Sequence, residues 1–329
     1  MKTKITALAI SVIMMCSMMS SCGKKEIQMH TYEAIVNGEA FKLTYPVASD
    51  EENLKTEEEM VEIDVAAANA VADALFMFSE ENSAGVGEIN KSVDAVFDCS
   101  EKLIDLLNYT YSVSTMTGGR YQPVLGTVTD LYKSGAEITD EALAEALTHT
   151  GMDLISIDEN SIIKTDRCAK LDYESISAGY ALADAAAVLS VNGVEYAVLT
   201  YMNTVATFGQ PLEKEKVDVA VYCSSSDENY HGVLSFNNSV VTTCNKESFV
   251  IDSSTGRKVE SSHDTVVVIS NDGILSNALA PVLYGMSTED IQKMYNSRVI
   301  KFEAVVIDEN GDVYTTSEAV EYRKNISAN

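Results

Sequence analysis

The stretch that decides the fold is ISAGYALADAAAVLSVNG, residues 176–193. Its many alanines and aliphatic residues, with no proline among them, predict a helix from about Ile176 to Val191. Asn192-Gly193 follows at once, and this pair is typical of a helix end. Helical patterns lie mainly before this segment and strand patterns mainly after it, so it marks the change between two differently built halves.

Two further helices are predicted upstream, because apolar residues recur there at steps of three and four. The first helix carries Met60, Ile63, Ala67, Ala70, Val71, Ala74, Leu75 and Phe78. The second carries Val93, Val96, Phe97, Leu103, Leu107 and Tyr111. Thr139, followed by Asp140 and Glu141, predicts the start of another helix, which Gly151 would stop.

Strand patterns dominate the second half. Val217, Val219 and Val221 alternate with other residues, and Glu159-Asn160 separates two short strand-like runs, 153–158 and 161–165. Further strands are expected at 232–236, 239–243, 264–270, 299–307 and 312–316, with a short helix over 275–284. The order favours an α+β fold: a single body with helices concentrated in its first half and mixed β-sheet with helices in its second.

The charge of the chain excludes one large class of partner. Its 329 residues include 50 Asp or Glu and 23 Lys or Arg, a formal net charge of −27. Nucleic-acid binding needs basic side chains that neutralise phosphates, so no nucleic-acid partner is expected. At 46% hydrophobic residues the chain is also not a disordered acidic tail.

The N-terminus predicts export. Lys2 and Lys4 precede a short apolar run, and small residues then lead to Cys22, a pattern typical of a signal peptide. It resembles a bacterial lipobox, so residues 1–21 are expected to be removed, Cys22 to be lipidated, and residues 22–31 to form a tether. The protein would then be anchored to a bacterial membrane and face the periplasm or the cell exterior. The alternative is an ordinary signal peptide in which Cys22 is incidental.

The remaining cysteines do not form a recognisable metal motif. Cys99, Cys168, Cys223 and Cys244 have no CxxC pair and no nearby His in the sequence, which argues against a zinc site. One or two disulfides would suit an exported protein, but buried free thiols are favoured. The four histidines are scattered, and none has a partner at a ligand or triad spacing.

Six short segments, in order over residues 32–317, resemble the FAD:protein FMN transferase family, the ApbE-like proteins also called thiamine biosynthesis lipoprotein-like. The family motifs are FS…SE(I/L)…N, TDGAFDPT…L…WGFG, LD…IAKGYA, VATS, HIIDPRTG and ADALAT. Their counterparts here are FS…EIN (78–90), TGGRYQP…LYKSG (117–135), LD…ISAGYA (171–181), VVTT (240–243), VIDSSTG (250–256) and SNALA (276–280). Residues 32–329 are therefore expected to form one FMN transferase-like domain.

The resemblance implies an activity and a site. Such proteins bind FAD and Mg²⁺, transfer FMN to a Thr hydroxyl of a partner flavoprotein and release AMP. The implied flavin-contacting residues are Ser79, Gly119, Tyr121, Gly179, Tyr180, Thr242, Thr243, Asp252, Thr255 and Gly256. The implied metal ligands are the backbone carbonyl of Ser177 and, weakly, Asn277. For the glycines the alternative is turn formation, and for the tyrosines it is packing in the core.

Several positions depart from the family pattern. Asn277 and Pro281 stand where the family has its metal-binding Asp and Thr, and Phe249 replaces a His. Gln122 and Thr204 also replace family Asp residues. Mg²⁺ prefers carboxylates, so its site is expected to be weak or absent. Two hypotheses follow: an FMN transferase with a rebuilt site, or a catalytically degenerate relative that acts as a flavin-binding or accessory lipoprotein.

Overall fold

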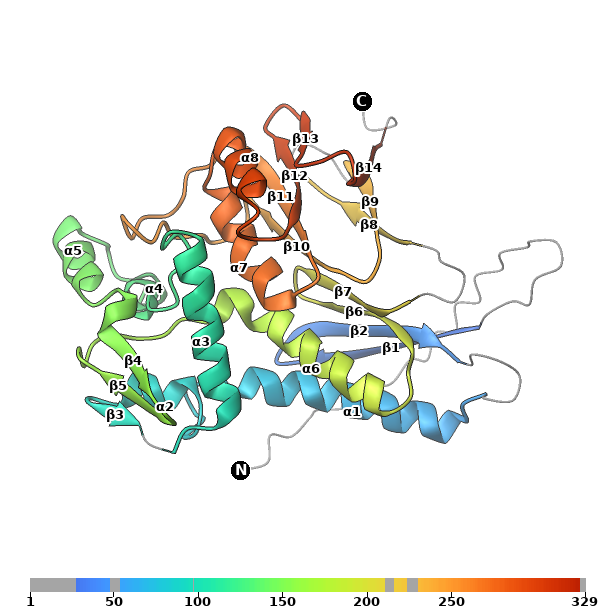
Figure 1. Cartoon of the computed structure of the whole chain (residues 1–329), viewed down its shortest axis with the longest axis horizontal. Helices are drawn as coiled ribbons and strands as arrows, with labels where there is room; N and C mark the ends of the chain where they lie inside the picture. Colours follow the sequence, from blue (N-terminus) through green and yellow to red (C-terminus); the bar gives the residue numbers. More distant parts are fainter. Residues whose placement is uncertain (1–27, 48–53, 97, 211–215, 224–229, 326–329) are drawn as a thin grey trace.

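A large antiparallel sheet forms the centre of the molecule (Figure 1). The computed structural model describes residues 28–47, 54–96, 98–210, 216–223 and 230–325. Eight strands lie in the order β1-β2-β6-β7-β10-β11-β12-β13. Their bounds are β1 Met29–Val36, β2 Glu39–Pro46, β6 Tyr196–Tyr201, β7 Thr204–Gly209, β10 Val240–Asn245, β11 His263–Ser270, β12 Glu303–Asp308 and β13 Val313–Thr315.

From β7 to β13 both faces of this sheet are covered, and the alternation of side chains along each strand explains how. Val266 and Val268 of β11 pack into the main core on the helical face, whereas Val267 packs into a second core on the other face. There it meets Leu234 of a three-stranded sheet, β14-β9-β8. The bounds of this sheet are β8 Val217–Val221, β9 Gly232–Phe236 and β14 Glu321–Lys324.

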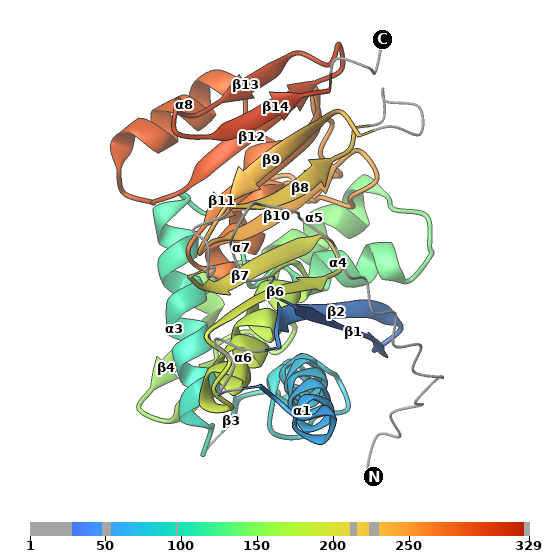
Figure 2. The ribbon, with the colours of Figure 1, turned by 90° about the vertical axis from the view of Figure 1, so that its right-hand side faces the viewer.

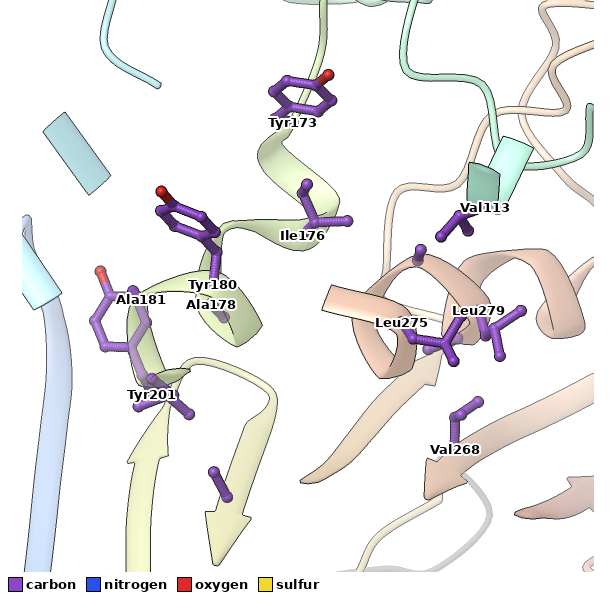
Figure 3. Packing of buried hydrophobic residues seen from close by; sticks show 14 of the residues in the cluster. Val113, Tyr173, Ile176, Ala178, Tyr180, Ala181, Tyr201, Val268, Leu275 and Leu279 are labelled. Atoms are coloured by element: carbon purple, nitrogen blue, oxygen red, sulfur yellow. The ribbon is translucent and has the colours of Figure 1, made fainter. Parts of the chain in front are cut away.

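Four helices build the main core on the helical face (Figure 2). They are α1 Glu57–Phe76, α3 Glu101–Met116, α6 Ser177–Val191 and α7 Gly273–Tyr284. Figure 3 shows Leu275 and Leu279 of α7 between Val113 of α3 and Val268 of β11. Helix α7 therefore lies in the interior, which fits its almost wholly apolar sequence.

Helices α6 and α7 touch through glycine. A Cβ atom added to Gly179 would lie 2.1 Å from the carbonyl oxygen of Gly273, so no larger residue fits at this crossing without a shift of backbone. This contact sets how closely the two helices approach, and the ends of both helices border the site described below.

A smaller lobe flanks α3. It contains a three-stranded sheet, β3-β5-β4, and three α-helices. Its elements are α2 Val86–Lys91, β3 Ala95–Val96, α4 Gly126–Lys133, α5 Asp140–Thr148, β4 Ile155–Asp158 and β5 Ser161–Lys164, with 3₁₀ turns at Met152–Leu154 and Glu174–Ile176. Helix α8, Thr288–Ser297, lies between α7 and β12.

Helix starts follow local capping chemistry. Thr56 accepts a hydrogen bond from the Glu59 amide at 3.2 Å, and the Glu59 carboxylate accepts one from the Thr56 amide at 2.7 Å. This reciprocal pair explains why an acidic stretch begins α1. Thr139 caps α5 in the predicted place, with a bond of 3.2 Å from Ala142 N.

The α+β fold class is confirmed, and so is the helix that ends at Val191. The second upstream helix was predicted too long: α3 begins at Glu101, and Val96 pairs in β3 with Ile162. Strands β1, β2, β6 and β7 were not predicted. Since β1 begins at Met29, residues 29–31 belong to the sheet and not to a tether.

The lipidation prediction at Cys22 and the signal peptide lie outside the described residues. Within the described ranges, no helix combines the length and the apolar character that crossing a membrane requires. Cys99, Cys168 and Cys244 are free thiols in the structure.

Candidate functional site

A cleft of about 690 Å³ opens between the small lobe and the ends of α6 and α7. Five segments line it: the loop before α4 with α4 itself, the 3₁₀ turn before α6, the turn between β6 and β7, the loop after β10, and the second half of α7. Its principal polar and aromatic residues are Arg120, Tyr121, Gln122, Tyr132, Lys133, Asp172, Glu174, Asn203, Ser248, Phe249, Asp252, Ser253 and Asn277. This volume is typical of a small-molecule site.

Asn277 borders the cleft, and both the oxygen and the nitrogen of its side-chain amide form hydrogen bonds within the protein. Its Oδ1 accepts a hydrogen bond from Gly179 N at 2.7 Å. Its Nδ2 donates to the hydroxyls of Thr204 and Thr242, at 2.8 and 2.6 Å. Asn277 and both threonines are buried. The amide therefore joins α7, α6, β7 and β10 as part of the packing.

Pro281 changes the same turn of α7. Because proline has no N–H, the helical bond from residue 281 to the carbonyl of Asn277 cannot form. Proline also has no side-chain ligand for a metal. The two positions where the family keeps metal ligands thus hold an amide that is already paired and an apolar ring.

Asn277 and Pro281 offer no carboxylate oxygen, the ligand that Mg²⁺ prefers, although Asp172, Glu174 and Asp252 line the same cleft. Among the residues that line the cleft, Asp252 is committed to its own turn: its Oδ1 accepts bonds from the Ser254 and Thr255 amides at 2.9 and 2.8 Å. Glu174 pairs with Lys133 at 2.8 Å. No step of the reaction is therefore assigned to a metal held at Asn277.

Asp252 organises one wall of the cleft. Although burial raises the pKa of its carboxyl, hydrogen bonds from Ser254 and Thr255 outweigh that effect and lower the pKa below its usual value, so Asp252 stays ionised. The turn ends at Gly256, whose φ of +67° suits glycine. The Tyr132 hydroxyl donates to the Gly256 carbonyl at 2.9 Å.

The same wall joins two segments that are distant in sequence. The Ser253 hydroxyl donates to the Gly119 carbonyl at 2.7 Å. Gly119 itself has a φ of +79°. Four residues predicted from the resemblance, Gly119, Asp252, Thr255 and Gly256, are therefore brought together, and their role visible in the structure is to hold two loops at the cleft.

Three aromatic side chains line the cleft. The rings of Tyr132 and Phe249 meet edge to face with centroids 5.0 Å apart, and Phe249 is 55% exposed. Tyr121 is buried, and its hydroxyl has no hydrogen-bond partner among the described residues. The cleft thus combines exposed ring surface, on which a flat ligand can stack, with an unused donor in its wall.

Arg120 and Lys133 are the cationic side chains that line the cleft. Burial alone would lower the pKa of Lys133, but its hydrogen bond to Glu174 and the nearby carboxylates raise it, so the ammonium stays charged. Arg120 is exposed and has no ion pair within 4.0 Å among the described residues. Its guanidinium is available to an anionic ligand.

Other predicted site residues lie elsewhere. Tyr180 packs in the core: its ring meets Phe78 edge to face with centroids 5.3 Å apart, and Lys102 Nζ lies 5.2 Å from its ring centroid. The ring projects away from α6 on the side opposite α7 (Figure 3). Flavin stacking on Tyr180 is therefore not what the structure supports, because its ring is already covered by protein.

The remaining predicted residues support the cleft from behind or from a distance. Gly179 and Thr242 lie beneath Asn277, as described above. Thr243 exchanges bonds with Asn203, with its carbonyl accepting from Asn203 Nδ2 at 2.7 Å. Ser177 begins α6, where its carbonyl faces the helical ladder. Ser79 caps a turn after α1 by accepting from Glu81 N at 3.1 Å, and it does not line the cleft.

Sequence reasoning did not select Arg120, Tyr132 and Lys133. All three lie inside segments that carry the family resemblance, residues 117–135. Their position in those segments was the available signal, but only the fold shows that α4 turns the side chains of Tyr132 and Lys133 toward the same space as Arg120.

Comparison with known families identifies the class of protein to which this fold and cleft belong. A model of the ApbE family matches residues 41–306, so the chain belongs to the ApbE family. No curated protein matches the chain by sequence.

Solved structures share the fold. The flavin transferase ApbE from Vibrio cholerae has a TM-score of 0.73 at 16% identity, covering 88% of this chain and 98% of its own. The flavinyl transferase ApbE from Pseudomonas stutzeri, in its apo form, has 0.72 at 18%, covering 88% and 94%. The ApbE protein from Thermotoga maritima has 0.74 at 18%, covering 87% and 96%.

Proposed function

We propose that the cleft binds FAD and that the protein transfers FMN from FAD to a Thr hydroxyl of a partner flavoprotein. The observation that carries this proposal is the cleft itself. It is built from the segments that resemble the FMN transferase family, and it holds aromatic rings, two cations and an unused buried donor together. Membership of the ApbE family and structural relatives named as flavin transferases support it.

Different side chains of the cleft would contact the rings and the phosphates of a dinucleotide. Phe249 and Tyr132 offer ring surface to the isoalloxazine or adenine ring. Arg120 and Lys133 offer positive charge to the pyrophosphate, and a guanidinium is well suited to pair with phosphate oxygens.

The transfer step is balanced without any further reactant. The Thr oxygen of the acceptor forms a bond to the phosphorus of the FMN half, and the pyrophosphate bond to AMP breaks. AMP leaves with the bridging oxygen, and the hydroxyl proton passes to solvent. Arg120 and Lys133 would stabilise the charge that develops on the phosphate oxygens in this step.

A second candidate function has its own supporting observation. The Asn277 amide is uncharged and already hydrogen-bonded, and Pro281 offers no side-chain ligand, so these two positions supply no carboxylate to hold a metal. This favours a catalytically degenerate relative that binds flavin and acts as an accessory protein. Both candidates share FAD binding and differ only in transfer.

The location belongs to the proposal as well. Removal of residues 1–21 and lipidation of Cys22 would place the domain on a bacterial membrane, facing the periplasm or the exterior. The N-terminal sequence supports this, because a basic start and a short apolar run precede Cys22. The acceptor flavoprotein would then be found in the same compartment.

The test incubates the purified protein with FAD and a flavoprotein acceptor that carries a target Thr, with and without Mg²⁺. Covalently bound FMN on the acceptor is measured by mass, and FAD binding is measured separately by flavin fluorescence. Transfer supports the enzyme. Binding without transfer, beside an active ApbE control, supports the accessory function. Absence of FAD binding contradicts both.

A further inference from the structure

Three side chains of different chemistry meet outside the cleft, where α5 ends. His149 follows the last residue of α5, and Asp166 and Cys168 lie in the turn after β5. One ligand atom from each residue can be chosen so that all three atoms lie within 4.8 Å of one another. His149 Nδ1 and Asp166 Oδ2 are only 2.6 Å apart.

The turn holds the thiol beside the carboxylate. Asp166 Oδ1 accepts a hydrogen bond from the Cys168 amide at 2.7 Å, so Cys168 is fixed next to Asp166 while Oδ2 faces the imidazole. The Cys168 carbonyl in turn accepts from the Thr127 hydroxyl of α4 at 2.6 Å. Both backbone polar groups of Cys168, its amide and its carbonyl, are therefore hydrogen-bonded.

The surroundings favour a cation between these groups. Glu145 lies 3.5 Å from His149 Nε2, so when an ion displaces the Nδ1 proton that Asp166 now accepts, Glu145 can hold the proton on Nε2. A carboxylate behind a coordinating imidazole is the usual outer-shell partner of such a ligand. The position at the C-terminus of α5 adds the negative end of the helix dipole.

We propose that His149 Nδ1, Asp166 Oδ2 and Cys168 Sγ bind one thiophilic divalent cation of the Zn²⁺ class. One nitrogen, one carboxylate oxygen and one thiolate form a donor set suited to Zn²⁺, whereas Mg²⁺ and Ca²⁺ prefer oxygen ligands alone. Three protein ligands leave a fourth tetrahedral position for water. The thiol is exposed and His149 and Asp166 are partly exposed, so an ion can enter from solvent.

The structure brings His149 close to Cys168 although no His is near this cysteine in the sequence. His149 precedes Cys168 by 19 positions in the sequence, and the β4–β5 hairpin between them, residues 155–164, brings the chain back to the end of α5. No sequence spacing of the usual zinc motifs describes such a pair. The site depends on the hairpin register.

The bound ion would stabilise one side of the cleft without taking part in its chemistry. Helix α5 packs on the turn after Asp252: Leu143 lies against Gly256, and Arg257 pairs with Asp140. A metal would join the end of α5 to the turn 166–169. That turn contacts α4 and continues to Asp172, so the metal would connect α5 to two further parts of the cleft wall. None of the three ligands lines the cleft.

The test titrates the full-length, chelator-treated and reduced protein with Co²⁺ and then with Zn²⁺. We expect one Co²⁺ per chain with a thiolate-to-cobalt charge-transfer band in the near ultraviolet, displacement of the band by Zn²⁺, and a rise in Tm with Zn²⁺. Cys168→Ser should abolish the band, and His149→Gln should weaken binding at least about tenfold. Cys99→Ser, a matched thiol elsewhere in the small lobe, should change neither.

The absence of the band in the unsubstituted protein would overturn the proposal. A band that persists in Cys168→Ser would also overturn it, because the thiolate would then come from another cysteine. Weak Co²⁺ binding without the band would show that the ion binds only to surface carboxylates, which contradicts the proposed site. Because the readout does not involve flavin, this outcome is separate from success or failure of the proposed function.

Discussion

Asn277 Oδ1 accepts a 2.7 Å hydrogen bond from the backbone amide of Gly179, which joins α7 to α6 beneath the cleft. The amide nitrogen of the same side chain donates to two threonine hydroxyls. A carboxylate could only accept here, so both threonine hydroxyls would have to turn and donate to it, whereas the amide donates to both. A residue that could serve as a metal ligand is thereby used for packing.

The first prediction follows from that network. Asn277→Asp buries a charge and requires both threonine hydroxyls to reverse their hydrogen bonds, so we expect it to lower the free energy of unfolding by about 1–3 kcal/mol in chelator. Combined with Pro281→Thr, it should strengthen Mg²⁺ binding relative to the unsubstituted protein. Calorimetric titration and Tm with and without Mg²⁺ measure both effects. Asn296→Asp on the exposed face of α8 is the control. Equal Mg²⁺ affinity in the unsubstituted protein and the double variant would contradict the assignment of residues 277 and 281 to the metal position.

The second prediction concerns the helix crossing. Gly179→Ala would place a Cβ atom 2.1 Å from the Gly273 carbonyl oxygen. Because backbone must move, we expect a loss of about 1–3 kcal/mol or more in urea denaturation. Gly285→Ala is the matched control, since its added Cβ would have no atom closer than 3.5 Å. Similar stabilities for the two variants would show that α6 and α7 do not approach as described.

The third prediction separates recognition of the phosphates of the ligand from recognition of its flavin ring. Arg120→Gln should weaken binding of FAD and of ADP about tenfold or more, because a charge-assisted contact to phosphate is lost. Riboflavin has no phosphate, so its binding should not change. Fluorescence titration measures the flavins, and calorimetry measures ADP. Arg323→Gln, which removes an arginine paired with Asp218 on the small sheet, is the control for charge. Equal losses for FAD and riboflavin would contradict this role.

The fourth prediction is a pH dependence. Burial raises the pKa of the Cys244 thiol from 9.0 to about 11, although Ser248 opposes the shift. The unfolded chain therefore releases this proton at lower pH than the folded protein does. Stability from the neutral thiol is fully present below pH 9 and is lost as the pH rises toward 11, about 2–3 kcal/mol in total.

Cys244→Ala should remove this part of the pH dependence. The measurement is the difference in unfolding free energy between the two proteins across pH 8 to 11, so the titration of other groups cancels. A difference that stays constant over this range would show that the thiol is not protected by burial. Cys168→Ala serves as the control, because that thiol is exposed.

Local chemistry in the sequence determined several elements in advance. The alanine-rich run before Asn192-Gly193 forms α6, Thr139 caps α5, and alternating valines form β8. Each of these depends on neighbours within a few residues. Asn37-Gly38, between β1 and β2, is also a local hairpin signal, with both residues at positive φ, but no hairpin was predicted there.

The sequence by itself also determined the family resemblance and the loss of a carboxylate at Asn277. Only the tertiary structure decided what the residues in the family-like segments do. Tyr180 turns into the core because α1 and α3 cover that side of α6, whereas Arg120, Tyr132 and Lys133 reach the cleft because α4 lies against it. His149 and Cys168 meet because a hairpin returns the chain. Periodicity fixes which residues share a face of an element, but contacts between distant segments decide what that face meets.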